Sequence, residues 1–178
     1  VVLAGEVKSE AYLDVQKIAR EVIAKIGYTK SEYMFDSNSC GILSAIHEQS
    51  ADINQGVERA NPEDQGAGDQ GIMFGYATNE TKTLMPTAIH ISHRLSERLA
   101  AVRKSGEVDF LRPDGKTQVT VGFEGTVPKT IEAVVLSTQH NPGVSHADIV
   151  DAMLEGIAQR VVGAVVVFVV RVAQVLVM

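Results

Sequence analysis

The spacing of apolar residues changes along the chain between helical and strand-like patterns. Over residues 14–26 apolar residues recur at helical spacing, and Gly27 follows, which predicts an amphipathic helix. Residues 87–104 predict a longer helix, with Ala88, Ile91, Leu95 and Val102 facing inward. A third helix is expected to begin at Ser145, with Ile149, Met153 and Ile157 on its apolar side.

Strand patterns lie between these helices. Residues 1–7 are expected to form a buried strand, 72–77 a second strand, and the mixed segment 39–47 is interpreted as strand-like. Residues 118–123 and 131–137 flank a turn at Glu124-Gly125 and predict an antiparallel hairpin, preceded by a turn at 112–115. Because a hairpin interrupts the alternation of strands and helices, we expect an α+β fold with mixed or antiparallel sheets and helices packed on one face.

Composition and charge narrow the class of protein. The chain has 178 residues, of which 45% are hydrophobic, so it has ample material for a core. Its formal net charge is −6 and it has no lysine or arginine cluster, which argues against a nucleic-acid partner. A single cysteine, Cys40, excludes an internal disulfide and suits a reducing compartment, so we expect a cytoplasmic protein without a membrane partner.

The C-terminal segment 161–178 is nearly all valine and alanine. A membrane span needs about 20 apolar residues, and Arg171 and Gln174 interrupt this run, so that interpretation is disfavoured. Two others stay open. The segment is either one or two buried strands or a terminus that does not represent the natural protein.

Glycines are concentrated in residues 66–75. Their spacing satisfies G-x-G-x-x-G, but loop residues precede them and β-favouring residues follow, whereas a dinucleotide site needs a strand before and a helix after. We therefore expect a loop that leads into a strand and approaches a ligand or another backbone closely. The polar segment 48–68 is too long for an ordinary connector and is typical of a lid, a binding loop or disorder.

Two consecutive segments of the chain resemble S-adenosylmethionine synthetase (methionine adenosyltransferase), namely DINQGVERANPEDQ and GAGDQGIMFGYATNET. Further matches follow in the family's order over residues 1–155, namely GEV, FDSNSCGILSAIHEQS, LRPDGKTQVTV and VVLSTQH. The resemblance implies a methionine-side domain at 1–80, a second α+β domain at 81–160, and a segment of uncertain identity at 161–178. It also implies that the family's first segment and its later nucleotide loops lie outside these residues.

The resemblance implies a reaction as well. In the family the methionine sulfur attacks C5′ of ATP, and the released triphosphate is then hydrolysed, so no catalytic nucleophile from the protein is required. Such a site works by aligning the reactants and neutralising the leaving group. Mg²⁺ and K⁺ are the expected ions, with no metal ligand expected within this chain. The expected partners are ATP, L-methionine and further copies of the chain, as a homodimer or a dimer of dimers.

Matching the family's motifs assigns five residues to binding. Glu6, Gln49 and Asp69 are expected to bind methionine, and Asp114 and Lys116 to bind ATP. A mobile loop is expected from Gln49 to Arg59, including Asp52, Asn54 and Gln55. Without the resemblance, plainer interpretations apply: an edge-strand charge for Glu6, a solvated amide for Gln49, a turn residue for Asp69, and a surface lysine for Lys116.

Several alternatives were weighed. Gly115-Lys116-Thr117 resembles the end of a phosphate-binding P-loop, but the first glycine and the following helix are missing. His90 and His93 lack further ligands at a recognisable spacing for zinc. The family often has alanine at the position of Gly115, so this difference from the family is expected to be mild. The alternative function is a non-catalytic fragment or a binding and assembly module with the methionine-side site and dimer interface, and the chain alone is expected to show negligible turnover.

Overall fold

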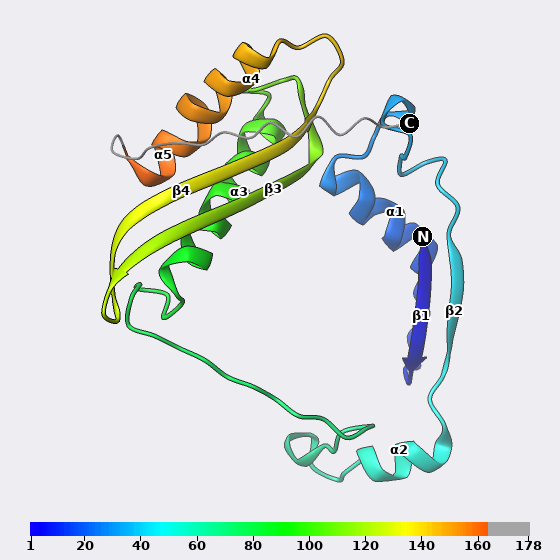
Figure 1. The fold of residues 1–178 in the computed structure, drawn as a ribbon. Helices are drawn as coiled ribbons and strands as arrows, with labels where there is room; N and C mark the ends of the chain where they lie inside the picture. The colour runs from blue at the N-terminus through cyan, green and yellow to red at the C-terminus, as the bar shows by residue number, and fades with distance from the viewer. Residues whose placement is uncertain (164–178) are drawn as a thin grey trace. The chain divides into compact units, whose positions relative to one another are not determined.

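The computed structural model describes residues 1–163, which fall into two compact units, Val1–Gly75 and the residues from Tyr76 onward (Figure 1). Nearly all of the valine-rich segment 161–178, for which strand and non-natural interpretations stay open, lies outside the described residues. The identities predicted for the domains at 1–80 and 81–160 stay predictions. None of the helices among the described residues is long and apolar enough to cross a membrane.

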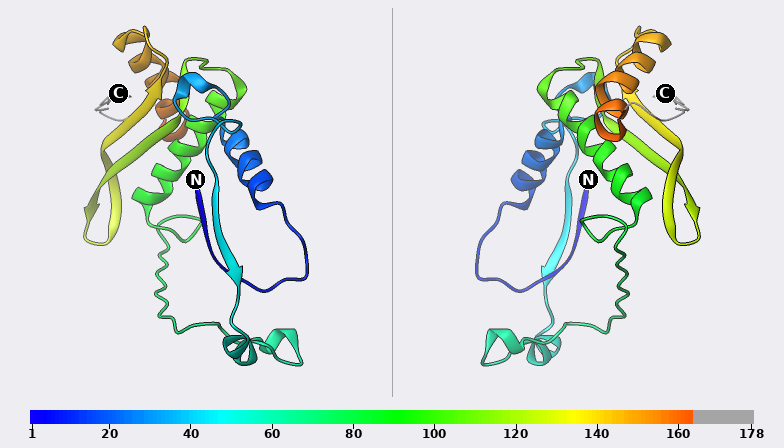
Figure 2. Two further views of the ribbon diagram at one scale, coloured as in Figure 1. Left: turned by 90° about the vertical axis from the view of Figure 1, so that its right-hand side faces the viewer. Right: turned by 90° about the vertical axis from the view of Figure 1, so that its left-hand side faces the viewer.

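The first unit is built on a two-stranded parallel sheet. Strand β1 (Val2–Val7) pairs with β2 (Leu43–Glu48) in one continuous register, and the two run side by side in both views of Figure 2. Helix α1 (Val15–Ile26) lies between them in sequence. Asp14 accepts a hydrogen bond from the Lys17 N–H at 3.0 Å, and Gly27 ends the helix at φ 119°. The helix predicted over 14–26 is therefore confirmed.

The loop that follows α1 contains two buried polar residues, Asp36 and Ser37. The Asp36 carboxylate accepts hydrogen bonds from the N–H groups of Asn38 and Ser39 and from the Ser39 hydroxyl, while Arg20 of α1 donates to the Ser37 and Asn38 carbonyls. The hydrogen bond from the Ser39 side chain, helped by the two N–H groups, lowers the pKa of Asp36 below its ordinary value. The short 3₁₀ turn Ser31–Tyr33 precedes this loop.

The first unit buries little apolar surface, and here one prediction is wrong. Residues 1–7 were expected to form a buried strand, yet Val2 is 70% exposed and Val7 52%. The apolar stripe of α1 is also largely exposed, apart from Ile23. Parallel strands are normally covered on both faces, and the other elements of the first unit do not supply that cover.

The strand predicted at 72–77 is also wrong. No strand forms there, and Met73 and Phe74 are each 95% exposed. A strand needs a neighbour to accept its backbone hydrogen bonds, and this segment has none among the described residues. The preceding polar segment contains helix α2 (Ala51–Val57) and a 3₁₀ turn at Pro62–Asp64.

The second unit joins helices to a long hairpin. It contains α3 (Thr87–Ser105), β3 (Leu111–Glu124), β4 (Val127–His140), α4 (His146–Asp151), a π-helical turn at Ala152–Ala158 and α5 (Gln159–Val162). The antiparallel hairpin is confirmed, and Gly125 takes a positive φ of 63° in its turn. The turn predicted at 112–115 is wrong because these residues belong to β3, where a register shift between Leu111 and Gly115 accommodates Pro113.

The core of the second unit lies between the hairpin and its helices. Figure 1 shows α3 crossing the hairpin, and its Leu95, Leu99 and Val102 belong to one buried cluster with β4 residues Val134 and Leu136. The C-terminal helix, formed by α4, the π-helical turn and α5 in succession, adds the residues predicted for its apolar side, Ile149, Met153 and Ile157, at 2%, 0% and 0% exposure. Ser145 caps this helix by accepting from the Asp148 N–H at 3.2 Å. The predicted fold class is confirmed.

Candidate functional site

Glu6, expected to bind methionine, lies near the end of β1. The parallel register places it opposite His47 of β2, and its Oε1 atom lies 3.2 Å from the His47 Nε2. The two side chains are 45% and 66% exposed, so this contact is a surface pair. The carboxylate can therefore change partner when a cationic ligand arrives.

Gln49 follows β2 directly, and its N–H donates to the Val7 carbonyl at 3.0 Å, which fixes it beside the end of β1. Its side-chain amide lies against Gly68. A Cβ atom on Gly68 would come within 2.9 Å of the Gln49 Nε2, so a side chain at 68 would displace that amide. Gly68 thus permits a close approach, as we expect of these glycines.

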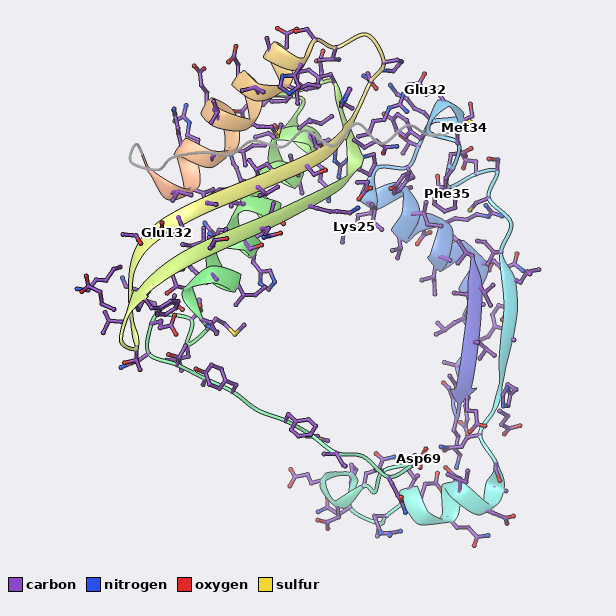
Figure 3. The ribbon with its side chains drawn as sticks, viewed as in Figure 1. Lys25, Glu32, Met34, Phe35, Asp69 and Glu132 are labelled. Carbon is purple, nitrogen blue, oxygen red and sulfur yellow. The ribbon has the colours of Figure 1, made fainter. Side chains whose placement is uncertain are left out.

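Asp69 comes next, in the segment that folds back toward α2 (Figure 3). Gly66 anchors this return: its N–H donates to the Val57 carbonyl at 2.9 Å, and a Cβ there would lie 2.6 Å from the Gly56 carbonyl oxygen. Asp69 is exposed, and within residues 1–163 its carboxylate accepts a hydrogen bond only from its neighbour, the Gln70 N–H, at 2.7 Å. The glycines therefore bring the segment that carries Asp69 next to Gln49, although 19 positions separate Gly68 from Gln49 in sequence.

The predicted mobile loop 49–59 is largely helical, because α2 covers 51–57. Asp52, Asn54 and Gln55 all lie on this helix, and the Arg59 guanidinium donates to the Gln55 and Glu58 carbonyls at 3.3 and 3.0 Å. The mobility of the segment stays a prediction.

A hollow of about 560 Å³ lies beside Gln49, between the end of the sheet and α2. Lys8 and Glu58 form an ion pair across it, and the hydrogen bond from Lys8 lowers the pKa of Glu58 below its ordinary value. Glu10, Glu48 and Gln49 also line it, so carboxylates outnumber cations. No pattern in the sequence pointed to Lys8, Glu48 or Glu58, because the pairing of β1 with β2 and the position of α2 after β2 bring these distant positions together.

The residues expected to bind ATP lie on β3 in the second unit. Asp114 and Lys116 are exposed, and neither side chain forms a hydrogen bond or ion pair with any residue in the part of the chain that the structure describes. Gly115 between them faces α3, and a Cβ there would lie 2.4 Å from the Leu99 Cδ2. The structure thus presents an acid and a lysine on either side of Gly115, two positions apart on an irregular strand.

Among residues 1–163, no group of three or more His, Cys, Asp or Glu side chains is placed to hold a metal ion. His90, weighed above as a zinc ligand, instead contacts the Thr83 hydroxyl through Nδ1 at 3.0 Å. The described residues therefore do not supply a complete Mg²⁺ or K⁺ site of this kind.

Comparisons with known proteins bear on both units. Residues 1–51 match the family model for the N-terminal domain of S-adenosylmethionine synthetase, and residues 64–176 match the model for its central domain. The S-adenosylmethionine synthase of Flavobacterium johnsoniae is 67% identical over 143 residues, which cover 79% of this chain and 34% of the relative. That of Phocaeicola vulgatus is 61% identical over 150 residues, covering 83% of this chain and 35% of the relative.

The chain therefore spans about a third of the length of the relatives it matches. The central-domain match alone covers more than half of the chain, and the N-terminal match precedes it. The chain belongs to the S-adenosylmethionine synthetase family.

Proposed function

We propose that this chain is part of a methionine adenosyltransferase, which forms S-adenosylmethionine from ATP and L-methionine. The observation that carries the proposal is the 67% identity over 143 residues to a protein named S-adenosylmethionine synthase. All five proposed ligand-binding positions lie within the residues that the two family models match, 1–51 and 64–176.

The methionine side is proposed to lie in the first unit. A free amino acid carries an ammonium and a carboxylate, so its site needs an anionic group for the first and a hydrogen-bond donor for the second. Glu6 and Asp69 offer carboxylates, and the Gln49 amide offers a donor. The close packing of Gln49 against Gly68 supports this grouping, as does the excess of carboxylates around the adjoining hollow.

The ATP side is proposed to lie on β3. In this proposal the Lys116 ammonium lies near the phosphates of ATP, and Asp114 contacts the rest of the nucleotide. Their freedom from other partners among the described residues supports this assignment, because neither has to break a contact within that region before it binds.

The chemical step in this proposal is a displacement in which the sulfur lone pair of methionine forms the bond to C5′ as the C5′–O bond to triphosphate breaks. The protein forms no covalent bond, so its residues act by positioning the two substrates in line and by excluding water. Mg²⁺ and K⁺ are proposed as ions of the whole protein. The step described above does not involve them, since no group of three or more His, Cys, Asp or Glu side chains within residues 1–163 could hold a metal ion.

An oligomer, a homodimer or a dimer of dimers, completes the proposal. The first unit exposes large apolar residues on both strands and on α1, including Val2 and Leu43 at 70% each and Val22 at 51%. Contiguous exposed apolar surface is typical of an interface. A cytoplasmic location is also proposed, which the single cysteine supports.

The test is titration calorimetry of the 178-residue chain with L-methionine, comparing Asp69→Asn with Glu63→Gln. Both variants remove one negative charge from the same segment, but only Asp69 is proposed to touch the ligand. A charge-assisted hydrogen bond is worth about 1.5–3 kcal/mol, so Asp69→Asn should weaken binding roughly 10- to 100-fold. Glu63→Gln should leave it unchanged.

Equal affinities in all three proteins would refute the assignment of Asp69. Adding ATP and measuring S-adenosylmethionine tests the expectation that the chain alone shows negligible turnover, which product would contradict. The two candidate functions are separated in the complete polypeptide, where loss of S-adenosylmethionine formation in Asp69→Asn favours the enzyme and an unchanged rate favours the binding and assembly module.

A further inference from the structure

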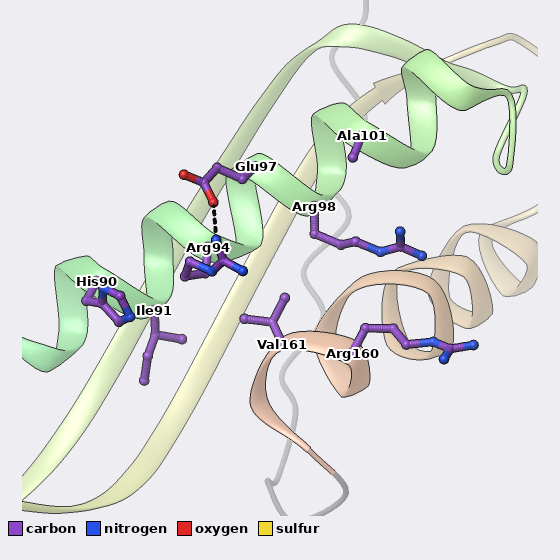
Figure 4. Close-up of a pocket in the computed structure, with 8 residues that line it drawn as sticks. All are labelled: His90, Ile91, Arg94, Glu97, Arg98, Ala101, Arg160 and Val161. Atoms are coloured by element: carbon purple, nitrogen blue, oxygen red, sulfur yellow. Dashed lines mark hydrogen bonds and ion pairs between the residues drawn. The ribbon is translucent and has the colours of Figure 1, made fainter. Parts of the chain in front are cut away.

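A basic hollow lies in the second unit, away from β3 residues Asp114 and Lys116. It has a volume of about 400 Å³ and lies between α3 and the C-terminal helix (Figure 4). Arg94 and Arg98 of α3 and Arg160 of α5 line it, so three arginines surround one hollow in a chain whose net charge is −6. The family assignment gives these residues no role.

Arg98 is the fixed cation of this hollow. Its Nε–H donates to the Gly156 carbonyl at 2.9 Å, and a terminal N–H donates to the Glu107 carboxylate at 2.6 Å. Its side chain is only 29% exposed. These bonds use two of the five N–H donors of a guanidinium, so Arg98 is held in place and still has donors to offer.

Arg160 and Arg94 are the adaptable cations. Figure 4 shows Arg160 extending in the same direction as Arg98 from the facing helix. Its side chain forms no hydrogen bond or ion pair with any of residues 1–163. Arg94 pairs with Glu97 at 2.8 Å, but those side chains are 62% and 64% exposed, and a surface pair of this kind contributes little stability.

The charge balance of the hollow favours an anion. Three arginines and one carboxylate, that of Glu97, line the hollow, and Arg98 also pairs with Glu107 outside the lining, so a net positive charge remains. Planar guanidinium groups match the oxygen geometry of a phosphate and bind it through paired hydrogen bonds. The volume falls within the range of small-molecule sites, about 300–1,000 Å³.

The remaining wall is apolar. Ile91, Ala101 and Val161 line the hollow beside the cations. A free phosphate would leave this wall unused, whereas a phosphate on a small apolar body would contact both parts. We propose that this hollow binds a small phosphomonoester, with Arg98 and Arg160 on the phosphate and Ile91 and Val161 against the organic group.

The test uses the 178-residue chain at neutral pH and constant ionic strength, titrated with inorganic phosphate and with phenyl phosphate. Binding is followed by backbone amide chemical shifts, which also locate it. We expect shifts at Arg98 and Val161 and tighter binding of phenyl phosphate. Arg160→Gln should weaken binding roughly 10- to 100-fold, from the loss of about 1.5–3 kcal/mol of charge-assisted hydrogen bonding. Because Arg160 is exposed, this variant should fold normally.

Two controls make the result specific. Lys104→Gln removes the same charge from an exposed position of α3 outside the hollow, and Lys116→Gln removes it from the proposed ATP side. Both should bind phenyl phosphate like the parent protein. A role for Arg160 that is limited to stabilising the C-terminal end of its helix predicts no response to phosphate, and this result would overturn the proposal. Equal loss in Lys104→Gln, or binding lost only in Lys116→Gln, would overturn it too, as would equal affinity for the two probes.

Discussion

Replacing Gly115 with alanine tests how closely α3 packs on the strand that carries Asp114 and Lys116. A Cβ at this position would lie 2.4 Å from the Leu99 Cδ2, whereas ordinary carbon–carbon contacts are about 3.5–4.0 Å. Leu99 is 8% exposed and belongs to the core. The new methyl group therefore has to move a core side chain by roughly 1 Å or shift the strand.

The expected cost follows from two opposing effects. Overpacking of a core costs about 1–3 kcal/mol. Replacing glycine with alanine at a compatible backbone conformation gains about 0.4–1 kcal/mol by restricting the unfolded chain. Gly115→Ala should therefore lower the free energy of unfolding by about 1–2 kcal/mol. This loss of stability is larger than the mild effect that is expected because many family members have alanine at this position.

Thermal unfolding followed by far-ultraviolet circular dichroism measures this cost, at roughly 4–8 °C per kcal/mol for a unit of this size. Gly122→Ala is the matched control on the same strand, because its Cβ would meet the exposed side chains of Thr130 and Glu132, which can rotate away. Combining Gly115→Ala with Leu99→Ala removes the obstructing atom, so the added cost of Gly115→Ala should vanish in that background. An unchanged or raised melting temperature for Gly115→Ala alone would refute the packing argument.

Two further predictions concern stability. The Thr87 N–H donates to the Glu80 carboxylate at 2.9 Å and holds the pKa of Glu80 below its ordinary value, so the folded protein binds this proton less tightly than the unfolded chain. The stability that this gives is complete above the pKa of the unfolded chain and is lost as the pH falls through the pKa of the folded protein. The free energy of unfolding in urea should therefore fall less between about pH 6 and pH 4 for Glu80→Gln than for the parent protein. An equal fall in the two proteins contradicts this prediction. Met153 is 0% exposed, so Met153→Ala should lower the free energy of unfolding by about 2–5 kcal/mol in the same assay. Met73 is 95% exposed, so Met73→Ala should change it by less than about 0.5 kcal/mol. Equal losses would show that Met153 does not contribute to the core.

The periodic spacing of apolar residues correctly predicted the elements that pack in the core of the second unit. The α3 helix, the hairpin and the apolar side formed by Ile149, Met153 and Ile157 were all predictable, because each buries its periodic residues against a neighbour in the same unit. The turn at 112–115 was not, since Pro113 and Gly115 are common both in turns and at irregular positions of a strand. Only the pairing of β3 with β4 distinguishes the two.

The sequence by itself determined the family, the fold class and which residues are candidates for binding methionine and ATP, because these depend on the identity and order of residues. Tertiary structure alone decided which of them meet. Gly66 and Gly68 bring Asp69's segment against Gln49 because glycine lacks the Cβ that would prevent the approach. Likewise, Arg98 and Arg160, 62 positions apart, line one hollow only because α3 and α5 pack together. Residues 72–77 have the composition of a strand but remain exposed, since a strand forms only where a second backbone accepts its hydrogen bonds.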